Sequence, residues 1–324
     1  MRRELRPAPR AGFTLIELLV VIAILAVLAA LVAAGIGRVQ TAQRGRVTDQ
    51  TVTKLQLALD NQWKAICDNC RDDRRSFATP NKQQDFVNMV AICDGDVDRA
   101  ESLWMYMKLR QNMPQTFAEA TSNVVVSNAA KTVSVTLLPS STFRQLPTGT
   151  GALEESAALL YMIVGQGGRG TNFSVDDATQ GAQMSVTAGG STFPAFKDGY
   201  GNPIVFVRFF QSDEVLLPPY VRIRPALTAG AQQFDDPLDQ AGRLFLWTNA
   251  TVKNQIQPQL FAQPLYFTMP PYLTPLNLPS PLLPTAFNGR NRLPVVISTG
   301  VDASSDPNDN VFGYRLTRQG NKGD

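Results

Sequence analysis

The sequence predicts an α+β chain, in which a long amino-terminal α-helix, half of it in a membrane, packs on a globular domain of short helices and an antiparallel β-sheet. Three patterns support this fold class. An apolar run covers 18–34, helical spacing of apolar residues continues to about Ile66, and strand-like segments rich in Val, Ile and Phe appear only after residue 123.

The composition is that of a folded protein and argues against catalysis. Of 324 residues, 44% are hydrophobic and 18% are charged, so wholesale disorder is not expected. The chain has no histidine. This excludes Ser-His-Asp and Cys-His catalysis and the usual histidine-containing zinc sites. We therefore expect a protein that is not an enzyme.

The formal charge of +3 lies entirely in residues 1–12, which hold four arginines and one glutamate. Subtracting these from 30 basic and 27 acidic residues leaves 26 of each sign. A general electrostatic attraction to nucleic acid is therefore not expected, and nucleic acid is not a predicted partner.

The amino-terminal segment predicts a membrane anchor. The basic stretch is followed by Gly12-Phe13-Thr14-Leu15-Ile16-Glu17 and then by the apolar run. Counted from Phe13, the run is long enough to cross a hydrocarbon core of about 30 Å as a helix. The arginines precede it, so the positive-inside rule puts residues 1–12 in the cytoplasm. We expect a single-pass protein of the inner (cytoplasmic) membrane whose carboxyl-terminal domain is extracytoplasmic or periplasmic.

Glu17 is unusual, because a carboxylate at the start of a spanning segment costs free energy and usually has a function. Gly-Phe-Thr-Leu-Ile-Glu before an apolar run resembles the prepilin cleavage and methylation motif of type IV pilins and type II secretion pseudopilins. The resemblance covers roughly the first 40 residues. An ordinary secretory signal peptide and a plain signal anchor remain as alternatives.

This resemblance implies a pilin-like fold and a defined processing route. A prepilin peptidase would cleave after Gly12, and Phe13 would be N-methylated. In this family the carboxylate of Glu17 is thought to pair with the Phe13 amine of a neighbouring subunit. The expected organisation is a leader at 1–12, a transmembrane and assembly helix at 13–37, and a globular domain at 38–324. The expected partners are prepilin peptidase, other pilin-like subunits, the inner-membrane assembly platform and the membrane.

Periodicity predicts further elements after the first helix, which we place at Thr14 to about Ile66. Two cysteines follow at 67 and 70, and the Asp/Arg cluster at 71–75 is interpreted as a solvated loop or a helix end. The other predictions are helices at about 83–92, 96–114 and 154–164, strands at 123–137, 204–210, 221–224 and 244–247, and an extended proline-rich insert at 258–294.

The three cysteines predict one disulfide outside the cytoplasm, between Cys67 and Cys70 or between one of these and Cys93. A zinc site of three Cys and one Asp is a further alternative. A thioredoxin-like reaction would need a βαβ setting, which the sequence does not show.

Two carboxyl-side segments resemble the major pseudopilins. One is 198–204, with its Asp-x-x-Gly-Asn-Pro turn, and the other is 295–311. In major pseudopilins the second segment binds calcium, which implies ligands at Asp302 and Asp309, at Asp306 by proximity, and at the backbone carbonyl of Ser298. Calcium prefers six to eight oxygen ligands, which this loop of Asp, Asn and Ser could supply. A polar turn without metal is the alternative.

Together these patterns predict a pilin-like structural subunit of a type II secretion pseudopilus or a type IV pilus-like filament. One alternative is a minor pilin or surface adhesin that binds a partner through its large domain and the proline-rich insert. Another is a membrane-tethered enzyme that uses carboxylates, which the missing histidine disfavours.

Overall fold

The computed structural model has an α+β fold and divides into two compact units, Met1–Arg46 and Val47–Asp324. The residues that it describes are 15–76, 84–149, 153–165, 181–210, 236–239, 242–244, 246–261, 293–298, 300 and 311–313. The predicted leader at 1–12 and most of the proline-rich insert lie outside them.

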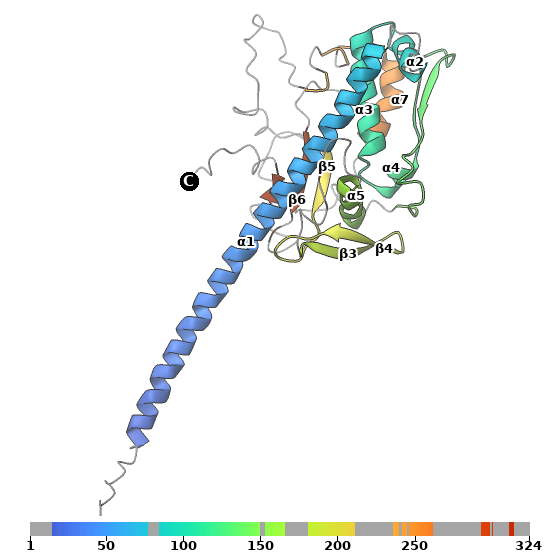
Figure 1. Cartoon of the computed structure of the whole chain (residues 1–324). Coiled ribbons are helices and arrows are strands. Elements are labelled where there is room, and N and C mark those ends of the chain that lie inside the picture. Colours follow the sequence, from blue (N-terminus) through green and yellow to red (C-terminus); the bar gives the residue numbers. More distant parts are fainter. Residues whose placement is uncertain are drawn as a thin grey trace, which may run out of the picture. The chain divides into compact units, whose positions relative to one another are not determined.

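The first element is α1, Leu15–Arg75 (Figure 1). Its first turn carries Glu17, and its last turn carries Arg74 and Arg75, which suits the helix dipole at both ends. The helix begins where it was predicted but ends nine residues later than Ile66. The Asp/Arg cluster at 71–75 is therefore the end of this helix, as one of its two interpretations held, and it is not a loop. Cys67 and Cys70 are buried in the core three residues apart, which favours the additional two turns of helix.

In the second unit, α1 packs through one stripe. Val52, Leu55 and Leu59 are completely buried and recur at steps of three and four, as one face of a helix requires. Gln56 lies on the same side and binds the backbone of a strand. Its Nε2 donates to the carbonyl of Pro294 and its Oε1 accepts from the amide of Val296, each at 2.9 Å.

Three further helices follow as α2 (Gln84–Ile92), α3 (Val97–Asn112) and α4 (Phe117–Thr121). The first two confirm the predicted helices. α3 is capped by Asp96, whose carboxylate accepts from the amide of Arg99 at 3.1 Å. The helical residues predicted to be core, which are Leu103, Met105, Tyr106, Met107 and Leu109, are all buried.

The strands that the structure describes form three small antiparallel sheets (Figure 1). β1 (Val124–Ser127) pairs with β2 (Ser134–Leu137), and β3 (Gln183–Ala188) pairs with β4 (Ser191–Phe196) through a Gly189-Gly190 turn with positive φ at both residues. The third sheet has the order β5 (Val205–Phe210), β6 (Leu293–Ser298), β7 (Val311–Phe312). Every residue of β5 and β6 is buried, so this sheet is the centre of the second unit.

The described part of the second unit contains two further helices. α5 (Leu153–Gly165) packs against β4 and β5, as its buried Ala157, Leu160 and Val164 indicate. α7 (Ala250–Leu260) buries Val252, Ile256 and Leu260, which are spaced by four. The predicted insert at 258–294 therefore begins inside a helix, since Pro258 is in the last turns of α7, and it ends inside β6.

The predicted strand at 244–247 was also wrong. The described residues of this segment form turns, in which the amide of Leu244 donates to the carboxylate of Asp239 at 2.9 Å. The indole Nε1 of Trp247 donates to Oδ2 of Asp94 at 2.8 Å. The guanidinium of Arg99 lies 5.0 Å from the centroid of the Trp247 ring. The predicted strand at 221–224 lies outside the described residues.

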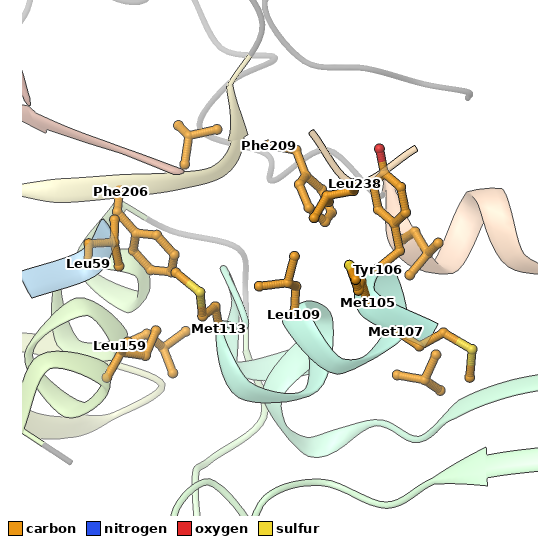
Figure 2. Close-up of a cluster of buried hydrophobic side chains, with 14 of the residues drawn as sticks. Leu59, Met105, Tyr106, Met107, Leu109, Met113, Leu159, Phe206, Phe209 and Leu238 are labelled. Carbon is orange, nitrogen blue, oxygen red and sulfur yellow. The ribbon is translucent and has the colours of Figure 1, made fainter. Parts of the chain in front are cut away.

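The core of the second unit joins α1, α3, α5 and β5. Figure 2 shows side chains from each of them, together with Leu238 of the segment 236–239. Tyr106 of α3 packs against Phe209 of β5 at 5.1 Å between ring centroids and against Phe261 at 5.8 Å. These contacts bring together residues that are more than 100 positions apart in the chain.

A buried ion cluster links four elements around this core. Arg208 of β5 has no exposed surface, and its Nη2 lies 2.7 Å from the carboxylate of Glu119 in α4. Arg110 of α3 lies 3.3 Å from the same carboxylate and also donates to the carbonyl of Gln259 in α7. Burial lowers the pKa of the Arg110 guanidinium. Removing Glu119 would leave two buried guanidiniums without their shared anion, so this carboxylate stabilises the packing of these elements.

Candidate functional site

The apolar part of α1 is the strongest candidate for a functional surface. The segment Leu15–Val32 has a mean hydropathy of 3.2 over 18 residues, and none of these residues is buried within the chain. Thirteen large aliphatic side chains in it are 45–82% exposed. Complete burial of such a side chain is worth about 1.5–3 kcal/mol, so covering these partly exposed ones is worth roughly half of that each, on the order of 10–20 kcal/mol in all. Such a surface needs lipid or another protein to cover it.

Glu17 is the acidic residue in this segment. It lies in the first turn of α1, where the dipole of the helix favours a negative charge, and it is exposed. Its neighbours Leu15 and Ile16 are 82% and 69% exposed. The predicted cleavage and methylation residues, Gly12 and Phe13, lie outside the described residues, so their predicted roles stay predictions.

The predicted calcium loop is described only at its margins. Asp302, Asp306 and Asp309 lie outside the described residues. Ser298, at the end of β6, is completely buried, and its hydroxyl donates to Oδ2 of Asp198 at 2.7 Å. The described residues contain no cluster of three or more His, Cys, Asp and Glu side chains that could hold a metal ion.

The structure does bring together the two segments that resemble major pseudopilins. Asp198 is almost completely buried, and its Oδ1 accepts from the amides of Tyr200 and Asn202, each at 2.9 Å. Asn202 in turn donates through its side chain to the carbonyl of Gly300 at 2.8 Å. The turn at 198–203 therefore holds the chain at 298–300, where the predicted calcium loop begins.

The same turn is attached to α1. The amide of Gly199 donates to the hydroxyl of Thr48 at 2.9 Å, and Thr48 is completely buried. Sequence reasoning identified the turn but not these contacts. The only local sign is a threonine among polar residues on a helix, which is too common to predict a partner 151 residues away.

The three cysteines lie in the core as free thiols. No disulfide joins Cys67 to Cys70, or either of them to Cys93, in the structure. Two helical residues three apart have Cβ atoms about 5–6 Å apart, whereas a disulfide needs about 3.5–4.5 Å. Burial raises the pKa of the Cys67 thiol to about 12, and burial also raises the pKa of Cys70 and of Cys93.

Comparison with known proteins identifies the amino-terminal segment. Residues 8–33 match the family described as the prokaryotic N-terminal methylation motif. This match is consistent with the prepilin motif of type IV pilin-like and pseudopilin precursors, and it contains Gly12, Phe13, Glu17 and the whole exposed apolar segment Leu15–Val32. No curated protein and no solved structure matches the chain.

Proposed function

We propose that this chain is a structural subunit of a type II secretion pseudopilus or a type IV pilus-like filament, and that its apolar helix drives assembly. The observation that carries the proposal is the exposed segment Leu15–Val32, which contains Glu17 in its first turn and lies within the matched methylation motif. The motif supports a pilin-like precursor, and the exposed segment supplies the surface that membrane storage and filament packing would cover.

Processing converts the precursor into an assembly-competent form. Cleavage by a prepilin peptidase after Gly12 removes residues 1–12 and with them the entire +3 charge. Phe13 then becomes the amino terminus and is methylated. The remaining helix stays in the inner membrane, with Val47–Asp324 on the extracytoplasmic side, until the assembly platform moves it into a filament.

Glu17 sets the axial position of each subunit in this proposal. A carboxylate in an apolar filament core is costly unless it is paired. The Phe13 amine of the neighbouring subunit can pair with Glu17 at only one axial offset between the two subunits. The apolar contacts supply most of the free energy, and the charge pair selects among otherwise similar packings.

The test is a Glu17→Ala substitution in the full-length precursor. We expect normal processing, because cleavage occurs five residues earlier, and incorporation into filaments at least about tenfold lower, since a lost charge pair in an apolar setting is worth more than 1.4 kcal/mol. Sheared filaments and membranes would be compared by immunoblot, and the mature amino terminus mapped by mass spectrometry.

The matched control is Asp72→Ala, which removes an exposed carboxylate from the other end of the same helix. It should assemble normally. Normal incorporation of the Glu17 variant would contradict the role of this residue, and a native amino terminus other than N-methylated Phe13 would contradict the proposed function as a whole.

A calcium ion in the loop that contains Asp302, Asp306 and Asp309 is part of this proposal. What supports it is the buried turn of Asp198, which holds Ser298 and Gly300 in place directly before that loop. A fixed starting point reduces the conformational entropy lost when the loop closes around an ion.

A further inference from the structure

A pocket of about 340 Å³ lies in the second unit, between the last turns of α1, the first half of α3 and the segment around Pro237 and Leu238. Its lining includes Met105 and Leu238, which are 4% and 3% exposed, so it has an apolar base. The volume is at the lower end of the range for small-molecule sites, which begins at about 300 Å³.

Five charged side chains line the same pocket, and positive charge is in excess. Arg71, Arg74 and Arg243 carry three positive charges, against two negative charges on Asp98 and Glu101. Arg74 pairs with both acids, since its guanidinium donates to the carboxylates of Asp98 and Glu101. The lining therefore has a net charge of +1, and the acids nearest to Arg71 and Arg243, which are Asp68 and Asp96, do not line the pocket.

These two arginines are held only weakly by other side chains. Arg71 pairs with Asp68 at 2.7 Å, but the two side chains are 40% and 52% exposed, and exposed pairs contribute about 0–1 kcal/mol. The Nη1 of Arg243 lies 3.8 Å from the carboxylate of Asp96, which is too far for a hydrogen bond. Both guanidiniums can therefore turn to a ligand at little cost.

From this geometry we propose that the pocket binds a small organic carboxylate, with the charged group on Arg71 and Arg243 and a short aliphatic part on Met105 and Leu238. The planar guanidinium matches a carboxylate with two parallel hydrogen bonds. The apolar base favours an organic anion over an inorganic one, because only an organic anion has an aliphatic part that leaves water when it contacts Met105 and Leu238. This site is independent of filament assembly through α1.

Butyrate, butan-1-ol and inorganic phosphate separate the parts of this proposal. The full mature chain in a non-ionic detergent would be titrated with each probe at low salt and followed by saturation-transfer NMR. We expect butyrate to bind at least about tenfold more tightly than either of the other two, which lack the charge or the aliphatic part, because each part contributes on the order of 1.4 kcal/mol.

The double variant Arg71→Gln, Arg243→Gln should weaken butyrate binding by at least about tenfold. Both residues are half-exposed, so the variant should keep the melting temperature of the parent protein. Arg75→Gln is the matched control, because Arg75 lies one turn after Arg71 in α1, pairs with Asp72 and does not line the pocket. It should bind butyrate like the parent.

Three results would overturn the proposal. One is the absence of butyrate binding, and another is equal binding of butan-1-ol or phosphate. The third is an unchanged affinity in the double variant. None of these results bears on processing or filament assembly, so a failure here is distinguishable from a failure of the proposed function.

Discussion

Asp198 satisfies the polar groups of a turn that joins α1, β5 and the end of β6. Its two carboxylate oxygens accept from the amides of Tyr200 and Asn202 and from the hydroxyl of Ser298. All these groups are in or next to the buried centre of the second unit, so a lost acceptor leaves donors without partners, which is more costly than the loss of an exposed hydrogen bond.

We therefore expect Asp198→Ala to lower the free energy of unfolding by about 2–4 kcal/mol, since three donors lose their acceptor. Asp198→Asn should cost less, because the amide oxygen can still accept. Thermal melting of the full mature chain in detergent would measure both, with Asp72→Ala as the exposed control. An Asp198→Ala variant as stable as that control would show that the turn does not depend on this carboxylate.

The cysteines give a prediction about pH. The ordinary pKa of a thiol, 9.0, applies to the unfolded chain, whereas burial raises the pKa of Cys67 to about 12 in the folded chain. Between these values the folded state binds more protons than the unfolded state, so stability is fully present below pH 9 and falls as the pH rises towards 12. Cys67→Ala should flatten this alkaline fall, as melting temperatures between pH 8 and pH 11 would show.

Thiol labelling checks the same residues directly. Buried, protonated thiols react slowly, so native protein at pH 8 should take up little reagent and unfolded protein should show all three thiols. Unfolded protein that shows one thiol without reductant would mean that a disulfide forms in the native protein, as the amino-acid sequence alone had predicted.

Among the elements, β1 shows how the fold protects a strand edge. The side chain of Gln259 accepts from the amide and donates to the carbonyl of Val125, at 2.9 and 2.8 Å. Gln255, one turn earlier in α7, accepts from the amide of Ser127 at 3.1 Å. Two glutamines four residues apart on a helix therefore form hydrogen bonds with backbone groups of β1 to which another strand could otherwise pair.

We expect the double variant Gln255→Ala, Gln259→Ala to expose this edge and to increase self-association of the full chain. Light scattering and thioflavin T fluorescence over time would measure it. Gln84→Ala is the control, because Gln84 is an exposed residue at the start of α2 that bonds only to a side chain of its own helix in the described contacts. Identical association of the two variants would contradict a protective role for the glutamine pair.

The elements also show which local signals can be read in advance. α2 and α3 were predicted because their apolar periodicity and the cap at Asp96 are local. α7 was missed, although Val252, Ile256 and Leu260 have helical spacing, because Pro258 and the proline-rich stretch after it favoured an extended segment. A proline inside a helix removes one hydrogen bond and crowds the carbonyl four residues earlier, at a cost of about 3 kcal/mol, and the burial of that stripe outweighs this cost here. The Gly189-Gly190 turn was a local hairpin signal that was available and not used.

For the molecule as a whole, a bound calcium ion would act on stability by mass action. If the loop with Asp302, Asp306 and Asp309 binds calcium, the ion should stabilise the mature full-length chain by about 2.7 kcal/mol at a hundredfold excess over its dissociation constant. Calorimetric titration and melting temperatures with calcium or a chelator would measure this, and Asp309→Asn should abolish the shift while Asp72→Asn leaves it unchanged. No calcium heat and no shift in the parent protein would end this proposal.

The amino-terminal motif, the exposed apolar segment, the balance of charge after residue 12 and most helices were readable from the chain itself. These features depend on residues that are close in the sequence. Helical hydrogen bonds join residues four apart, and the membrane affinity of an apolar segment is the sum of the contributions of its consecutive residues. The tertiary structure decided which distant groups meet: Asp198 with Ser298, Gln56 with β6, the glutamines of α7 with β1, and the arginines of α1 with Arg243 in one pocket. These contacts form only when the whole core packs. The neighbours of a polar side chain in the sequence do not indicate its partner, and pairing becomes necessary only when burial makes an unpaired group costly.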